Sequence, residues 1–383
     1  MKKLLIVLLS VLFALTLVGC GGGEKEASTT IKLGGSGPLT GGAAVYGNDV
    51  YHCAQLAIDE INAAEGTEYF AFKFEDDVAD PEKSPNAYGV LKDWGMQVSI
   101  YTTTSGAGLA VAEDYYNDRI FALTPSGSNT GLVYTNNKNY DNCFQVCFTD
   151  PNQGVASADF IKQNDLGSKV AIIYRSDDDY STGIYQTFKN RAAEIGLEVV
   201  YEGSFVDTDS DYSAQLNGAM NEGADVVFLP IYYTPAASIL TQADAMGYKP
   251  VFFGVDGMDG ILTQEGFNTD LAEGVYLLTP FAADAQDEKT VKFVTAFKAK
   301  YGTVPTQFGA DAYDAVYAIY QACKAAGIDG TVSAEETCEE LIKQFTSMTF
   351  EGLTGTATWN AKGEVSKSPK AVIIENGAYV SAE

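Results

Sequence analysis

Two serines follow neighbouring strand-like segments of the sequence, where hydroxyl groups can bind an anion. Ser105 comes after a predicted strand at 98–101 and before a helix, and Ser128 lies in the next strand-to-helix loop, where Ser126 adds a backbone N–H. Donors at a helix N-terminus favour negative charge, and open α/β sheets bind ligands at this edge. These residues therefore predict a carboxylate-binding site, although both serines have the alternative role of simple N-caps.

The sequence lacks the motifs that would make such a site catalytic. It has no Gly-x-Ser-x-Gly elbow, no phosphate-binding loop, no His-Glu-x-x-His motif and no dinucleotide-binding glycine motif after the first strand. The single histidine, His52, is predicted on a helix, so a catalytic triad is not expected. Residues 207–211 begin like a calcium loop, but Tyr212 stands where glycine is required. We therefore expect no enzyme activity, no metal and no cofactor.

The strongly acidic composition argues against nucleic acid as a partner. The 383 residues include 51 acidic and 24 basic side chains, a formal net charge of −27. Such a surface repels phosphate backbones. Apolar residues make up 46% of the chain, which is ordinary for a folded protein, and the length favours two domains.

The N-terminus has the pattern of a secreted lipoprotein. Two lysines precede an apolar stretch that is too short for a membrane-spanning helix, which needs about 20 residues. The segment 17–20 (Leu-Val-Gly-Cys) resembles a bacterial lipobox, so we predict a signal peptide at 1–19 and a lipid on Cys20. The Gly-rich tract at 20–30 would then be a flexible tether, with the protein held outside the cytoplasm at a membrane. The alternative is an ordinary signal peptide with a chance cysteine.

Strand-like and helix-like segments alternate along nearly the whole chain. In the first half we predict strands at 31–33, 69–74, 98–101 and 120–123, and helices at 49–64, from Ser84-Pro85 to about 95, and from about 107. After Asp150-Pro151 the pattern begins again, with strands at 169–174, 197–205, 225–229 and 251–254, and helices at 181–195, 212–222 and 235–246. This alternation is typical of parallel sheets with helices on both faces, so we predict an α/β protein of two doubly wound lobes.

Several short motifs, in a fixed order, identify a family. They are Gly-Pro-Leu-Thr-Gly at 37–41, Glu-Asp-Asp at 75–77, Thr-Thr-Ser-Gly at 103–106, Thr-Pro-Ser-Gly-Ser-Asn at 124–129 and Phe-Gly-Val-Asp-Gly at 253–257. Each motif alone is weak, but their order and spacing are specific. Over about 31–374 the chain resembles the leucine/isoleucine/valine-binding proteins, the solute-binding lipoproteins of ABC importers that have the type I periplasmic-binding fold.

The resemblance implies two lobes joined by a hinge of three crossovers. Lobe 1 would comprise 31–149 and 280–355, and lobe 2 would comprise 150–279 and 356–383. A small-molecule ligand would bind in the cleft between the lobes, which close on it. The membrane subunits of an ABC permease would then recognise the closed form. We expect a monomer, because one chain supplies both halves of the site.

The resemblance also assigns roles to single residues. Asp256 lies where the family places an acid, usually glutamate, that binds the ligand ammonium, and its side chain is shorter by a methylene group. An Asp-Gly pair is also a turn signal, so Asp256 has the alternative role of a solvated turn residue. Asp150 is either a second ligand-binding acid or only a hinge turn. Tyr46 would flank the ligand from lobe 1, while Tyr180 and Tyr232 would close over it from lobe 2.

The predicted cargo is a free amino acid, branched-chain or otherwise apolar. Its carboxylate, ammonium and side chain would each find a partner, and the small residues at 41–44 leave room for more than an alanine. Two alternatives stay open. The same fold could bind an amide, urea or an aromatic acid, for which Asp256 would be unnecessary, or it could present its ligand to a separate sensory protein.

Overall fold

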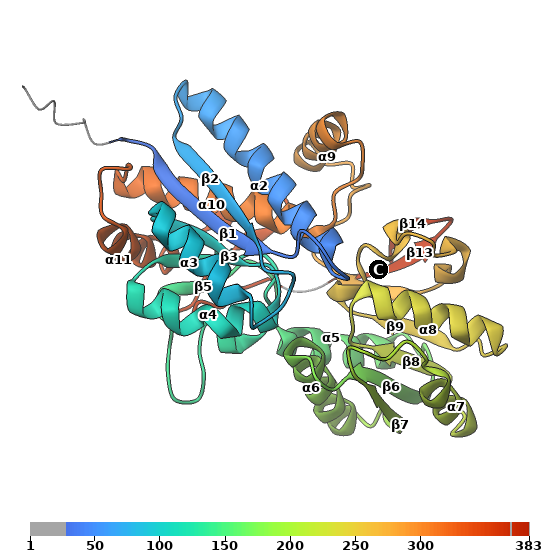
Figure 1. Ribbon diagram of the computed structural model, residues 1–383. Coiled ribbons are helices and arrows are strands. Elements are labelled where there is room, and N and C mark those ends of the chain that lie inside the picture. The colour runs from blue at the N-terminus through green and yellow to red at the C-terminus, as the bar shows by residue number, and fades with distance from the viewer. Residues whose placement is uncertain (1–27, 368–369, 383) are drawn as a thin grey trace, which may run out of the picture.

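Helices and strands alternate through the computed structural model, which describes residues 28–367 and 370–382 (Figure 1). The predicted signal peptide, Cys20 and most of the predicted tether lie outside the described residues. Within the described part of the chain, the helices are all too short or too polar to cross a membrane. The α/β fold class predicted from the sequence is confirmed.

The first sheet has five parallel strands in the order β2-β1-β3-β4-β5. They are β1 (Ile31–Gly37), β2 (Phe70–Asp76), β3 (Val98–Thr102), β4 (Phe121–Thr124) and β5 (Cys143–Gln145). The inner strands β3 and β4 are buried along their whole length, as expected where helices cover both faces of a sheet. The helices of this unit are α2 (Ala44–Glu65), α3 (Ser84–Trp94), α4 (Ser105–Asp118), α9 (Glu288–Tyr301), α10 (Gln307–Ala326) and α11 (Ala334–Phe345).

The second sheet has seven strands in the order β14-β13-β10-β9-β8-β6-β7. They are β6 (Lys169–Arg175), β7 (Glu198–Phe205), β8 (Val226–Leu229), β9 (Val251–Gly254), β10 (Tyr276–Thr279), β13 (Lys370–Glu375) and β14 (Ala378–Ser381). Its helices are α5 (Asp150–Gln163), α6 (Asp179–Ile195), α7 (Ser213–Asn221) and α8 (Tyr233–Ala245). Without the antiparallel β13 and β14, the order β7-β6-β8-β9-β10 repeats that of the first sheet, so the chain contains one topology twice.

The chain passes between the two units three times, after β5, after β10 and before β13. In Figure 1 the orange helices α10 and α11 lie with the blue N-terminal strands, whereas the red β13 and β14 lie beside the yellow elements. We call the unit of the first sheet lobe 1 and that of the second sheet lobe 2. This is the architecture of two doubly wound lobes with three crossovers that the sequence predicted.

The last crossover differs from its predicted place at residue 356. The short strands β11 (Phe350–Glu351) and β12 (Thr356–Ala357) pair with each other, and the chain then stays on lobe 1. Trp359 donates its indole N–H to the Gln145 carbonyl at 2.7 Å, and its ring packs on Phe345. Lys367 still pairs with Asp311 of lobe 1, and Lys370 is the first residue that joins the second sheet, so the change of lobe comes after Lys367.

A buried ion pair fastens this crossover to lobe 1. Lys367 Nζ lies 2.8 Å from Asp311 Oδ1 on α10, and the two side chains are 3% and 2% exposed. The ammonium also donates to the Thr354 hydroxyl. Buried charges are tolerated only when they are paired, so removing either side chain should lower the free energy of unfolding.

Two helix starts differ from the sequence prediction. Helix α3 begins at Ser84 with Pro85 in its first turn, as expected, but Lys83 is the N-cap and makes no side-chain cap. Ser84 instead donates its hydroxyl to the Ala107 carbonyl at 2.8 Å, which ties α3 to α4. Helix α2 begins at Ala44, earlier than predicted. The prediction missed this start because no side chain caps the helix, so the sequence has no capping pattern there.

Candidate ligand-binding site

The candidate residues lie where the carboxyl ends of strands from both lobes face each other. Ser105 follows β3, Ser126 and Ser128 follow β4, Tyr180 follows β6, Tyr232 follows β8 and Asp256 follows β9. The ends of parallel strands meet at one edge of a sheet, so loops that are distant in sequence converge there. Ten residues line the cavity between the lobes: Tyr46, Thr103, Thr104, Ser105, Ser126, Tyr180, Tyr232, Asp256, Gly257 and Phe308.

The structure brings together six of the eight predicted site residues in this cavity. Ser128 and Asp150 do not line it. The space measures about 10 Å³, which is room for about one water molecule. A larger molecule therefore enters only if the walls move apart.

The lobe 1 wall is the N-terminus of α4. Ser105 is the first residue of this helix, and the N-cap Thr104 makes no side-chain cap. The N–H groups of a first helical turn have no partner within the helix, so they favour an anion. The Ser105 hydroxyl accepts the Asn129 N–H at 3.2 Å, and a hydroxyl keeps its own hydrogen for a further acceptor.

Ser126, predicted as a backbone donor to the ligand, already forms two hydrogen bonds within the protein. Its hydroxyl donates to the Thr103 carbonyl at 2.5 Å, while its N–H, the predicted backbone donor, faces the Thr124 hydroxyl at 3.4 Å. The second contact is long for a hydrogen bond. The Ser126 N–H thus has a weak partner that a better acceptor would replace.

Ser128 and Asp150 lie together behind this wall, at the first crossover. The Asp150 N–H donates to the Ser128 carbonyl at 2.9 Å. The Ser128 hydroxyl and both Asp150 carboxyl oxygens are buried without a hydrogen-bond partner among the described residues. Burial raises the pKa of Asp150 well above its usual range. Asp150 begins α5, at the predicted lobe boundary.

Asp256 provides the acid on the lobe 2 wall. It begins a short 3-10 turn (Asp256–Met258) after β9 and is 2% exposed, which excludes the alternative of a solvated turn residue. The Tyr180 hydroxyl donates to Asp256 Oδ1 at 2.5 Å, and the Gly257 N–H donates to the Tyr180 oxygen at 2.9 Å. Burial outweighs these hydrogen bonds and raises the pKa of Asp256 to about 7.

Aromatic rings close the cavity on its remaining sides. The Tyr232 ring stacks on Tyr180 at a centroid distance of 4.9 Å and meets Tyr46 edge-on at 5.3 Å. Phe308 lies 4.6 Å from Tyr46 on the other side. The Tyr46 hydroxyl donates to the Gly257 carbonyl and accepts the Tyr233 N–H at 3.2 Å. Tyr46 therefore bridges the two lobes at the cavity.

A second contact between the lobes lies at the N-terminus of α10. The Thr306 N–H donates to Asp49 of lobe 1 at 2.6 Å, and the Gln307 N–H donates to Asp259 of lobe 2 at 2.9 Å. Carboxylates at a helix N-terminus are favoured by the helix dipole. Lobe 2 thus helps to cap a helix of lobe 1.

The sequence prediction missed four cavity residues: Thr103, Thr104, Gly257 and Phe308. Thr104 adjoins Ser105 and was within reach of the same argument, since it occupies an N-cap position. Phe308 comes from a helix some two hundred residues away in the chain, and its spacing on α10 is that of a core residue. Among the described residues, no group of three or more His, Cys, Asp or Glu side chains could hold a metal ion.

Comparison with known proteins assigns the fold to a family. The Leu/Ile/Val-binding protein homolog 3 of Brucella melitensis is 27% identical over 383 residues, covering 98% of this chain and 99% of its own. The crystal structure of the leucine-binding protein LivK of Thermotoga maritima has a TM-score of 0.83 at 27% identity, covering 92% of this chain and 98% of that one.

A further structure was determined with a ligand. LivJ of Streptococcus pneumoniae, a branched-chain amino acid transporter substrate-binding protein in complex with isoleucine, has a TM-score of 0.82 at 27% identity and covers 92% of this chain and 99% of that one. The family model described as "Periplasmic binding protein" matches residues 30–371, nearly all of the described chain. The chain therefore belongs to the periplasmic binding protein family, a family of solute-binding proteins.

Proposed function

We propose that this protein binds a free amino acid between its two lobes and delivers it to the membrane subunits of an ABC importer. The observation that carries the proposal is that the two walls of the cavity favour opposite charges. The N-terminus of α4 at Ser105 favours an anion, and the buried carboxyl of Asp256 favours a cation. An amino acid carries both charges on one carbon atom.

The carboxylate end would be held by lobe 1. Ser105 would donate its hydroxyl, and the free N–H groups of the first turn of α4 would add backbone donors. The Ser126 N–H is a further donor, and the unpartnered hydroxyl of Ser128 would join it if the wall shifts when the lobes open. These donors are present before the ligand arrives, so docking on lobe 1 comes first.

The ammonium end would be held by Asp256. A ligand cation supplies the opposite charge that the buried carboxyl lacks, and Tyr180 orients the carboxyl by donating to its Oδ1 atom. Asp150 lies too far behind the wall to line the cavity, so we propose that it acts at the hinge. Tyr46, Tyr180 and Tyr232 would enclose the ligand side chain.

Binding requires the lobes to separate and close again. The cavity holds about one water molecule, and Tyr46 seals it by its contacts with Gly257 and Tyr233 of lobe 2. A ligand stabilises the closed state by contacts that exist only there. Shifting the protein almost completely from the open to the closed state needs about 5.5 kcal/mol. One charge-assisted bond contributes about 1.5–3 kcal/mol, so both ends of the ligand must stabilise the closed state.

The proposed location is the outer face of a cell membrane. Periplasmic binding proteins of importers work outside the cytoplasm, and a lipid on Cys20 with a tether at 20–30 would keep the protein close to its permease. The named relatives bind leucine, isoleucine or valine, which makes a branched-chain amino acid the first candidate cargo. One chain supplies both walls of the site, so we propose a monomer.

A thermal-shift screen of the full chain in detergent tests the proposal. The ligands are the twenty amino acids, together with amides, urea and aromatic acids. At a hundred times its Kd a ligand adds about 2.7 kcal/mol of stability, which appears as a clear rise in Tm. A rise with leucine, isoleucine, valine or another amino acid is expected. A rise only with an amide or an aromatic acid would replace the cargo, and would make Asp256 unnecessary for binding.

A further inference from the structure

A second, larger cavity adjoins the candidate site. It measures about 710 Å³ and shares Thr104 and Tyr232 with the first cavity, so these two residues lie at the junction of the two spaces. We call it the outer chamber. Lobe 1 contributes residues 42–43 and 78–81 to its walls, and lobe 2 contributes the loops that follow β6 and β7.

Thr104 leaves a polar atom at the junction without a partner. The residue is 5% exposed, and its hydroxyl makes no hydrogen bond among the described residues. An N-cap threonine normally accepts an N–H of the following turn, but here it does not. A buried hydroxyl without a partner is unfavourable, so this atom points to a polar group of a ligand that lies between the two cavities.

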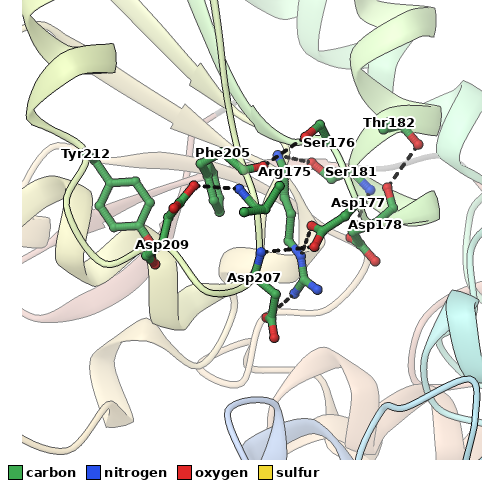
Figure 2. A network of polar contacts seen from close by, with 11 residues as sticks. Arg175, Ser176, Asp177, Asp178, Ser181, Thr182, Phe205, Asp207, Asp209 and Tyr212 are labelled. Carbon is green, nitrogen blue, oxygen red and sulfur yellow. Dashed lines mark hydrogen bonds and ion pairs between the residues drawn. The ribbon is translucent and has the colours of Figure 1, made fainter.

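Negative charge dominates the lobe 2 wall of the outer chamber. Arg175 is its one cationic lining residue, and its guanidinium is already paired with Asp177 at 2.8 Å and Asp207 at 2.7 Å (Figure 2). The Asp178 carboxyl, close by, is attracted by the charge of Arg175 but forms no ion pair among the described residues. One of its oxygens accepts the Ser181 N–H at 3.1 Å, as the N-cap of α6.

Aromatic rings line the same chamber on the side of Asp209. Phe205 and Tyr212, both 4% exposed, meet edge-on at a centroid distance of 5.0 Å and line the chamber. Figure 2 shows both on the same side of the network as Asp209. Aromatic faces and carboxylates together favour an alkyl ammonium group, because the rings contact its methylenes and attract its charge.

The lobe 1 wall is held in place by its own hydrogen bonds. Val78 and Ala79 have φ values of 58°, in the left-handed region that β-branched residues avoid. Asp76 accepts the Val78 N–H at 3.0 Å, and Asp77 accepts the Ala79 N–H at 2.9 Å. Strain of this kind persists where the surroundings enforce it and is concentrated at functional sites.

We propose that the outer chamber is a side-chain subsite for amino acids whose long side chain ends in a positive charge, as in lysine or ornithine. The α-carboxylate held at Ser105 would also accept the Thr104 hydroxyl, the methylenes would pass Tyr232, and the distal ammonium would lie beside Asp178. The inference rests on the proposed function, because Ser105 and Asp256 must hold the α-carboxylate and α-ammonium.

Calorimetric titration of the full chain in detergent tests this subsite. L-lysine is compared with L-norleucine, which has the same carbon skeleton without the distal charge, and with L-leucine. One charge-assisted contact makes lysine about tenfold tighter than norleucine. In Asp178→Asn this ratio falls to about threefold or less, and the N-cap survives because asparagine caps as well as aspartate.

A matched control removes the same charge elsewhere. Asp165 is exposed and has a φ of 48°, a conformation that asparagine tolerates, so Asp165→Asn should leave the ratio unchanged. The inference is overturned, and the proposed function stands, if leucine binds but norleucine and lysine have the same affinity. It is also overturned if the tenfold preference for lysine over norleucine is unchanged in Asp178→Asn. If none of the three amino acids binds, the inference is overturned, and the proposed function falls as well only if the thermal-shift screen finds no other amino acid that binds.

Discussion

Amino acid binding should depend steeply on pH through Asp256. Burial raises the pKa of this carboxyl to about 7, so about half of the free protein carries a neutral Asp256 at pH 7. A ligand ammonium binds the ionised form, and binding must therefore expel the proton at lower pH. The affinity is fully present above pH 7 and is lost as the pH falls.

The magnitude follows from the shift. Each pH unit below the pKa costs about 1.4 kcal/mol, or about a tenfold loss of affinity. Between pH 8 and pH 5 the affinity for leucine should fall about a hundredfold, and at pH 6 binding should release about 0.9 proton for each ligand. The stability of the unliganded fold should depend on pH in the opposite direction. The contribution of Asp256 to the free energy of unfolding is fully present below its ordinary pKa of 3.8 and is lost as the pH rises through about 7.

The two tyrosines beside Asp256 should not titrate in the same range. Burial raises the pKa values of Tyr46 and Tyr180 well above their usual range, so both keep their protons. Burial also raises the pKa of Asp49, at the second contact between the lobes, to about 7. The part of the pH dependence that disappears in Asp256→Asn is therefore the part assigned to Asp256.

Isothermal titration calorimetry with leucine at pH 5, 6, 7 and 8 measures both quantities. Two buffers of different ionisation enthalpy at pH 6 report the protons released. The variant Asp256→Asn should bind more weakly at pH 8 and should show no slope, because its amide does not titrate. A wild-type affinity that stays constant from pH 5 to 8, or a slope that persists in Asp256→Asn, would refute the reasoning.

Three further predictions concern the hinge, the anion wall and the first sheet. Lys367→Met leaves Asp311 buried without its partner and should lower the free energy of urea unfolding by about 3–5 kcal/mol, whereas Lys343→Met, at an exposed ion pair, should change it by about 0.5 kcal/mol or less. Ser105→Ala should weaken amino acid binding about tenfold in calorimetry and leave the protein folded; an unfolded variant would mean that Ser105 is structural. Gly363→Ala places a Cβ 2.1 Å from a backbone carbonyl of β5 at a φ of 80°, and should lower Tm by several degrees; an unchanged Tm would contradict this packing.

Much of the fold was predictable because hydrophobic periodicity is local. The strand at 251–254 and the helix ends at Gly95 and Gly327 follow patterns that a few neighbouring residues carry. The last crossover was not predictable in this way. Trp359 keeps the chain on lobe 1 by a hydrogen bond to Gln145, and no pattern near residue 356 reveals a partner so far away in the chain.

The same distinction between local patterns and tertiary contacts applies to the candidate site. Ser105 and Asp256 were predictable, because each directly follows a strand of a recognisable motif. The raised pKa of Asp150 was not, since it arises from burial between α5 and α6, where Asp150 packs against Gly183. Phe308 enters the cavity only through the packing of α10 on α2. Motifs thus identify the residues nearest the ligand, whereas tertiary packing decides which charges persist there.

The most direct test of the account compares leucine with 4-methylpentanoic acid, its analogue without the amino group. Both compounds are titrated calorimetrically into the full chain at pH 8, where Asp256 is ionised. If Asp256 holds the ligand ammonium, leucine binds and the analogue binds about a hundredfold more weakly, because the buried carboxylate is left unpaired. Equal binding of the two compounds would contradict the assignment of Asp256 and, with it, the claim that this protein selects free amino acids.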